Sequence, residues 1–98
     1  MYVVFLKFSD NRDQVGEHLD AHKAWIKQGF DDRVFLVAGS LQPALGGALL
    51  AHNTSADDLA ARVNEDPFVA EGVVSAEIME ITPAIADERM KFLLGAKD

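Results

Sequence analysis

The chain has 98 residues, no cysteine, and 16 acidic against 9 basic side chains, which gives a formal net charge of −7. A chain of this length suits one small domain that buries about 60–70% of its unfolded surface, and leaves no room for a second. The acidic balance argues against nucleic acid or an anionic membrane as a partner, because both attract basic patches, and the lack of cysteine excludes disulfides and thiolate chemistry.

The first residues do not look like a targeting segment. Residues 1–8 lack a basic leader and a small-residue cleavage site, and no run in the chain approaches the roughly 20 apolar residues of a membrane span. We therefore expect a cytoplasmic protein.

Residues 2–8 are aromatic and β-branched, which is typical of a strand. Both faces of this strand are largely apolar, so we expect it to be covered on both sides. The polar residues 9–11 then offer capping side chains for a helix over about residues 12–28, and Gly29 is well placed to end that helix.

This first helix carries the most chemically informative surface of the chain. At about 3.6 residues per turn, one stripe faces inward and includes an ionisable ring; it consists of Val15, Leu19, His22, Ile26 and Gly29. Trp25 borders the stripe and His18 precedes His22 by one turn. An ionisable ring on the core side of a helix needs a partner or a function.

A β-hairpin is predicted next. Residues 34–39 form a continuous apolar strand that closes at Gly39, residues 40–47 are rich in turn formers, and residues 48–52 form the return strand.

A second helix is predicted to begin at Ser55, because Ser55 and Asp58 match a capping box. It should stop before Asp66 and Pro67, since the residue before a proline avoids helical geometry. Pro67 is then suited to begin a further short helical turn.

The last predicted strand covers residues 73–81. Thr82 and Pro83 have the signature of a helix start, which predicts a C-terminal helix over about residues 83–95 that ends at Gly95.

This order of elements predicts an α+β ferredoxin-like βαββαβ sandwich with an extra C-terminal helix, in a single domain whose core covers about residues 2–82. Such a topology places both main helices on one side of a four-stranded antiparallel sheet. The other side is too apolar to be left in water. We expect a homodimer in which two sheets pack face to face, or an equivalent dimeric α+β barrel. Alternatively, the terminal helix covers part of that face or swaps onto the partner.

Several motifs resemble those of the YCII-related proteins, and the likeness covers most of residues 2–82. The motifs are His22 in the first helix, Ala38-Gly39-Ser40 at the end of the next strand, Gly46-Gly47 in the hairpin, Asp66-Pro67-Phe68, and Gly72 before the last strand. The chain departs from the family pattern at Ser40, where the family usually has proline, and the residues beyond Thr82 exceed the core pattern.

The resemblance implies a dimeric α+β barrel with a pocket on each subunit and a His–Asp pair in that pocket, carried here by His22 and Asp66. The family is similar in fold to muconolactone isomerase-type dimeric barrels. At least one relative is described as a dehydrochlorinase of a chlorinated aromatic breakdown product, and most members have no assigned reaction.

Such a pair suits proton transfer. If Asp66 accepts a hydrogen bond from one ring nitrogen of His22, the other nitrogen is left to exchange a proton with a substrate. We expect Ser40, Trp25, Phe68 and His18 to contribute to the substrate pocket. Ser40 would complete a Ser–His–Asp arrangement if its hydroxyl reached the ring, although the sequence contains no nucleophile elbow.

Plainer interpretations remain open for each residue. His22 can be a core histidine that Asp66 satisfies, Asp66 can simply cap the turn at Pro67, and Trp25 can serve the core or a dimer contact. His18 and His22 have the i, i+4 spacing of metal ligands, but the glutamate of HExxH is missing and no third ligand is evident, so we expect no metal.

Two functions are consistent with these features. The first is a small-molecule enzyme, a lyase or isomerase that uses His22 as general acid and base and acts on an aromatic or phenolic degradation product. The second is a non-catalytic ligand-binding or accessory dimeric module with the same pocket. No dinucleotide fingerprint and no haem or flavin motif is present, so we expect no cofactor.

Overall fold

A four-stranded antiparallel sheet in the order β2-β3-β1-β4 forms the frame of the structure. The central strand β1 (Tyr2–Phe8) pairs with β3 (Gly46–Ala51) and β4 (Val74–Glu80), and β2 (Phe35–Leu41) pairs with β3. The structure is a computed structural model that describes residues 1–94. The sheet order and the element order confirm the predicted α+β ferredoxin-like fold.

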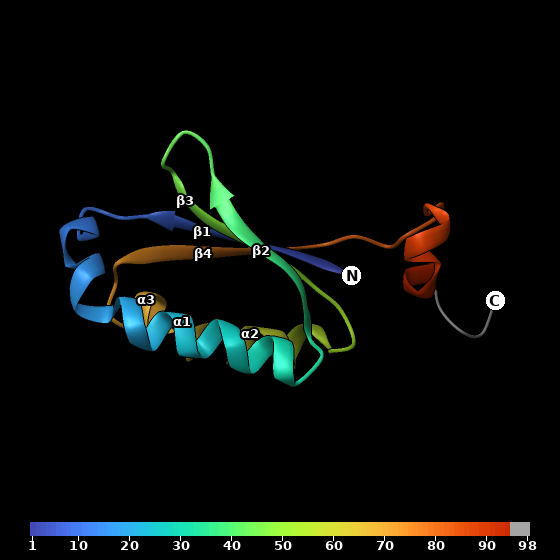
Figure 1. Ribbon diagram of the computed structural model, residues 1–98, viewed down its shortest axis with the longest axis horizontal. Helices are drawn as coiled ribbons and strands as arrows, with labels where there is room; N and C mark the ends of the chain where they lie inside the picture. Colours follow the sequence, from blue (N-terminus) through green and yellow to red (C-terminus); the bar gives the residue numbers. More distant parts are fainter. Residues whose placement is uncertain (95–98) are drawn as a thin grey trace.

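The helices cover one face of this sheet (Figure 1). They are α1 (Val15–Asp31), which follows a 3-10 turn η1 (Arg12–Gln14), then α2 (Ala56–Asn64) and the short α3 (Pro67–Ala70). The core lies between the two layers, and its buried apolar residues are Tyr2, Val4, Leu6, Val34, Phe35, Leu49, Ala51, Leu59, Val63, Phe68, Val73 and Val74.

The helix start predicted from residues 9–11 is not capped as expected, because neither the 3-10 turn at Arg12 nor α1 begins with a side-chain cap bond. Two other starts predicted from capping residues are confirmed. Ser55 is the N-cap of α2 and its hydroxyl accepts a hydrogen bond from the Asp58 amide at 3.1 Å. Asp66 is the N-cap of α3, with Pro67 in the first turn as predicted. The second helix also ends before Asp66, as the proline requires.

The prediction that Gly29 ends the first helix is wrong. The helix continues to Asp31, and Arg33 adopts the left-handed conformation with φ 64°. The Arg33 and Val34 amides donate to the carbonyl oxygens of Phe30 and Gly29, which is the Schellman arrangement that ends a helix. Gly29 is needed for another reason: a Cβ at this position would lie 2.2 Å from the buried Phe35 ring.

The predicted hairpin is present, but its turn is shorter than expected. The strands extend through Leu41 and from Gly46, so Ser40 and Gly47 are paired residues of the sheet. Gly39 lies within β2 and does not close it. The sequence overestimated the turn because small residues in a strand resemble turn formers.

The prediction of a regular helix from Pro83 is also wrong. Residues 82–87 are not helical, and a 3-10 helix η2 (Glu88–Leu94) follows them at one end of the molecule, beyond the layers of the sheet and the helices (Figure 1). Asp87 begins this turn, since its carboxylate accepts from the Arg89 amide. Ile85 is 93% exposed, and a short segment without a packing surface gains little from helix formation. The predicted end at Gly95 lies outside the described residues.

The face of the sheet opposite the helices carries an apolar row. Val37, Leu50, Val3 and Met79 are paired neighbours across the four strands and therefore share this face. Val37 and Met79 are each 52% exposed. In this single chain β1 is thus well covered on its helix side only. Among residues 1–94, no helix has the length and apolar character needed to cross a membrane.

Two glycines of α1 offer a matched test of the close contact with β2. We expect Gly29→Ala to lower the free energy of unfolding by about 1–3 kcal/mol, because the new methyl group displaces the Phe35 ring. Gly16→Ala, with no atom within 4 Å of the new Cβ, should raise it by up to about 1 kcal/mol. Urea unfolding of the two variants measures the difference, and equal effects would contradict this assignment.

Candidate functional site

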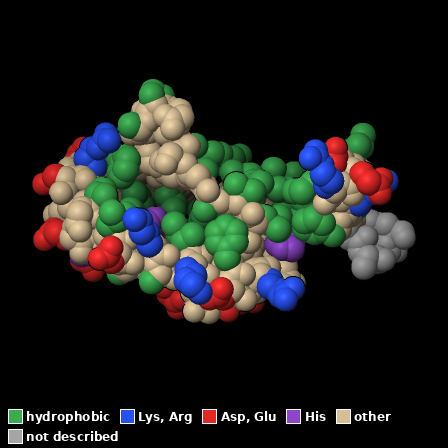
Figure 2. Space-filling model, viewed as in Figure 1, with side chains coloured by type: hydrophobic (Ala, Val, Ile, Leu, Met, Phe, Trp, Pro, Cys, Tyr) green, Lys and Arg blue, Asp and Glu red, His purple; other side chains and the backbone are tan. Residues whose placement is uncertain are grey.

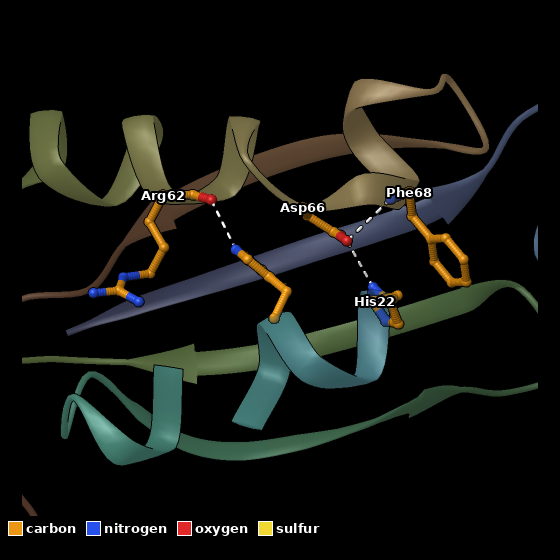
Figure 3. A network of polar contacts seen from close by, with 5 residues as sticks. His22, Arg62, Asp66 and Phe68 are labelled. Carbon is orange, nitrogen blue, oxygen red and sulfur yellow. Dashed lines mark hydrogen bonds and ion pairs between the residues drawn. The ribbon is translucent and has the colours of Figure 1, made fainter. Parts of the chain in front are cut away.

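Asp66 is the buried charged residue at the centre of the site. Its side chain is fully buried, and its carboxylate oxygen Oδ1 accepts hydrogen bonds from the Phe68 amide at 3.1 Å and from His22 Nδ1 at 2.7 Å. The first bond is a helix cap, and the second reaches across to α1. One oxygen therefore joins the start of α3 to the middle of α1, as Figure 3 shows.

The His22 ring is held on its faces as well as at Nδ1. The Phe68 ring stacks on it with centroids 3.9 Å apart and an interplanar angle of 9°. On α1 itself, the Trp25 ring lies at 6.0 Å in a looser stack. These contacts fix the position of the ring. The His22 side chain is still 13% exposed, so a small part of it stays accessible.

The partner at Nδ1 determines what the other ring nitrogen can do. If Asp66 is ionised, its carboxylate can only accept hydrogen bonds, and Nδ1 of a neutral His22 ring must then carry the proton and donate it to Oδ1. Nε2 then has a free lone pair. This arrangement suits a general base whose protonated form is stabilised by the neighbouring carboxylate.

A second set of contacts joins α1 to α2. Since α2 ends just before Asp66, these contacts also help to position Asp66. The Trp25 indole Nε1 donates to the Arg62 carbonyl oxygen at 3.0 Å, and the Arg62 guanidinium pairs with Asp32 at 2.9 Å. The Arg62 guanidinium and the Gln28 amide beside Asp32 hold the pKa of that carboxyl below its ordinary value. Figure 3 shows the contact at the Arg62 carbonyl oxygen beside the separate contacts that meet at Asp66.

His22 opens onto a pocket of about 340 Å³ between α1 and the sheet. Figure 2 shows hydrophobic side chains around a hollow on this face, with a histidine inside it and a basic side chain at its edge. The lining is mainly apolar, and its members are Leu6, Phe8, Val15, Leu19, His22, Lys23, Ile26, Ala38, Gly39, Ser40, Gly46, Gly47, Ala48, Leu49, Phe68 and Val74. Its volume lies at the lower end of the range for small-ligand sites.

The pocket exists because small residues occupy the helix side of the hairpin. Ala38, Ser40 and Gly47 share the face of Leu6 and Leu49 in the strand register. They cannot fill the space beneath α1, so the layers are separated there by a cavity.

Two of the four predicted substrate-binding residues line the pocket, and two do not. Ser40 lies on the sheet side and Phe68 beside His22. Trp25 is outside the lining and packs edge-on against the core residue Phe35, 5.2 Å away. His18 is partly exposed and also outside the lining. The structure thus gives Trp25 the role in the core that the sequence left open.

No hydrogen bond joins Ser40 to His22 within residues 1–94, so the structure adds nothing in favour of a Ser–His–Asp arrangement. Over the same range, no cluster of three or more His, Asp or Glu side chains suits a metal ion. His52 is outside the pocket lining, and its ring lies 5.5 Å from that of Phe92 on η2.

Lys23 and the hairpin glycines belong to the lining, although the sequence did not predict them as substrate-binding residues. Lys23 adjoins His22 on α1, at a position that helical periodicity assigns to the edge of the inward stripe. That stripe itself is confirmed, because Val15, Leu19, His22 and Ile26 all line the pocket.

Comparisons with known proteins support the fold. No protein-family model matches the chain, and no curated protein matches it at a significant level. Among solved structures, it is similar to the 5-chloro-2-hydroxyhydroquinone dehydrochlorinase TftG from Burkholderia phenoliruptrix AC1100, in complex with 2,5-dihydroxybenzoquinone. The TM-score is 0.69 over 82% of this chain and 91% of that chain, at 16% sequence identity. The two proteins share a fold.

The two capping residues allow the His22–Asp66 bond to be measured. We expect Ser55→Ala to lower the free energy of unfolding by about 1 kcal/mol, the usual value of an N-cap. Asp66→Ala should cost more, about 2–4 kcal/mol, because it also leaves His22 Nδ1 without its acceptor. Urea unfolding compares the two variants. A cost for Asp66→Ala no greater than that for Ser55→Ala would mean that the bond to His22 adds nothing to stability.

Proposed function

We propose that this protein is a small-molecule enzyme of the lyase or isomerase type, in which His22 is the general acid and base and Asp66 positions it. The observation that carries the proposal is the 2.7 Å contact between His22 Nδ1 and a fully buried carboxylate, beside a pocket that His22 itself lines. A purely structural histidine would need the carboxylate but not the opening.

The proposed chemistry is a proton transfer at Nε2. In the elimination of hydrogen chloride, Nε2 takes a proton from the substrate, the electron pair left behind forms a new double bond in the product, and chloride leaves with the electron pair of the carbon–chlorine bond. In an isomerisation, the same nitrogen returns the proton to another atom of the substrate. Asp66 stabilises the imidazolium formed in both cases, and positioned proton transfer of this kind contributes about 10²–10⁴ in rate.

An aromatic or phenolic substrate is proposed from the lining of the pocket. Ten of its members are aliphatic or aromatic residues, and the Phe68 ring adds a flat surface next to His22. TftG, which has the same fold, is a dehydrochlorinase of a chlorinated hydroxyhydroquinone. Together with the resemblance of its motifs, this supports placing the chain with the YCII-related proteins.

The proposal is tested with chlorinated hydroquinones, starting with 5-chloro-2-hydroxyhydroquinone, by measuring chloride release. We expect His22→Gln to lower the rate by about 10²–10⁴, because glutamine keeps a donor for Asp66 but cannot exchange a proton. His18→Gln changes a histidine of the same helix outside the pocket and should leave the rate unchanged.

A His22→Gln variant that stays folded and retains the full rate would end the proposal. Compounds that shift the NMR signals of the pocket residues without any turnover by the unaltered protein would favour the second candidate, a non-catalytic ligand-binding module.

We further propose that the protein is a homodimer whose sheets pack face to face, as a dimeric α+β barrel. The apolar row on the open face of the sheet supports this arrangement, because Val37 and Met79 are each half exposed there in the single chain. A second copy would bury the same row on both partners, as a two-fold interface requires.

A charge placed in this row should separate the subunits. We expect the unaltered protein to have twice the mass of the 98-residue chain in sedimentation analysis, and Val37→Asp to have the mass of one chain. Ala24→Asp places the same carboxylate at an exposed position of α1 and should remain dimeric. A monomeric unaltered protein, or a dimeric Val37→Asp variant, would contradict this interface.

A further inference from the structure

Among residues 1–94, Lys23 is the one lysine or arginine in the lining of the pocket, and no carboxylate side chain of this range belongs to the lining. The chain as a whole has 16 acidic and 9 basic residues. The protein as a whole repels anions, whereas the pocket combines one ammonium group with hydrophobic walls. The local charge is therefore opposite in sign to that of the whole molecule.

The charge of Lys23 is not neutralised by an ion pair within residues 1–94. By contrast, Lys27, one turn further along α1, pairs with Asp31 at 2.8 Å. The salt bridge of Lys27 is of the ordinary i, i+4 kind on an exposed helix face. Lys23 differs from it in lying at the pocket and in keeping its charge available.

A second cation lies just behind the pocket wall. The Arg12 guanidinium lies over the Phe8 ring, 4.5 Å from its centroid, and Phe8 lines the pocket. Arg12 also donates to the Ala44 carbonyl oxygen at 3.3 Å, which keeps it beside the hairpin. Two positive groups thus lie on or next to the lining.

We propose that Lys23 makes the pocket selective for anionic ring compounds, such as carboxylates or phenolates, with the ring on the apolar walls and the negative group toward the Lys23 ammonium. This rests on the proposed function for the identity of the pocket, and it adds the charge of the ligand. Lys23 is a specificity determinant in this assignment, and the proton transfer stays with His22.

The test compares benzoate with benzamide, which have nearly the same shape and differ in charge. Binding is followed by the shifts of pocket amide signals, such as those of Gly39 and Gly47, in NMR titrations at low salt. We expect the unaltered protein to bind benzoate about two- to fivefold more tightly than benzamide, which corresponds to the upper part of the range for an exposed charge pair. Lys23→Gln should remove this preference.

Lys27→Gln is the matched control, because it changes the net charge by the same amount on the same helix outside the pocket. It should keep the preference for benzoate. A preference unchanged in Lys23→Gln, or absent from the unaltered protein while benzamide still binds, would overturn the selectivity and leave the proposed function intact. If neither compound shifts the pocket signals, the pocket is not a site for simple rings. Both the selectivity for anionic rings and the proposed aromatic substrate class are then rejected.

Discussion

A single buried carboxylate joins the helical layer together at the site. Asp66 Oδ1 accepts both the hydrogen bond that caps α3 and the hydrogen bond from His22. The other oxygen, Oδ2, is buried without a hydrogen-bond partner within residues 1–94. A buried carboxylate with one unpaired oxygen is costly, so the bonds to Oδ1 must compensate for it. The helix cap and the His22 contact are therefore coupled, because both hold the same Asp66 oxygen in place.

This coupling explains why the imidazole is well positioned next to a cavity. The hairpin residues beneath α1 are too small to fill the space under the helix, so packing from the sheet does not hold the ring. Its orientation comes from the α3 side, through the Asp66 bond and the parallel Phe68 ring. A rigid ring beside empty space is what a positioned acid or base requires.

The sequence was sufficient for the order of elements and for most of the inward stripe of α1, since both depend on local periodicity and capping. It failed where one residue type serves two purposes. Gly29 looks like a helix end but is required by the close approach of Phe35. The helix instead continues to Asp31 and is terminated by Arg33, which adopts the left-handed conformation.

The His22–Asp66 contact joins residues 44 positions apart. Local patterns cannot place such a pair, and here it was expected only through the resemblance of motifs.

The structural and catalytic interpretations of His22 are not alternatives in this geometry. Nδ1 satisfies a buried carboxylate and so contributes to folding, while the ring itself lines the pocket. A fold can keep this pair for stability and still vary the reaction through the residues around it, because those residues decide which molecule reaches Nε2. In this chain, Lys23 and Ser40 are among the lining residues that would exert such a choice.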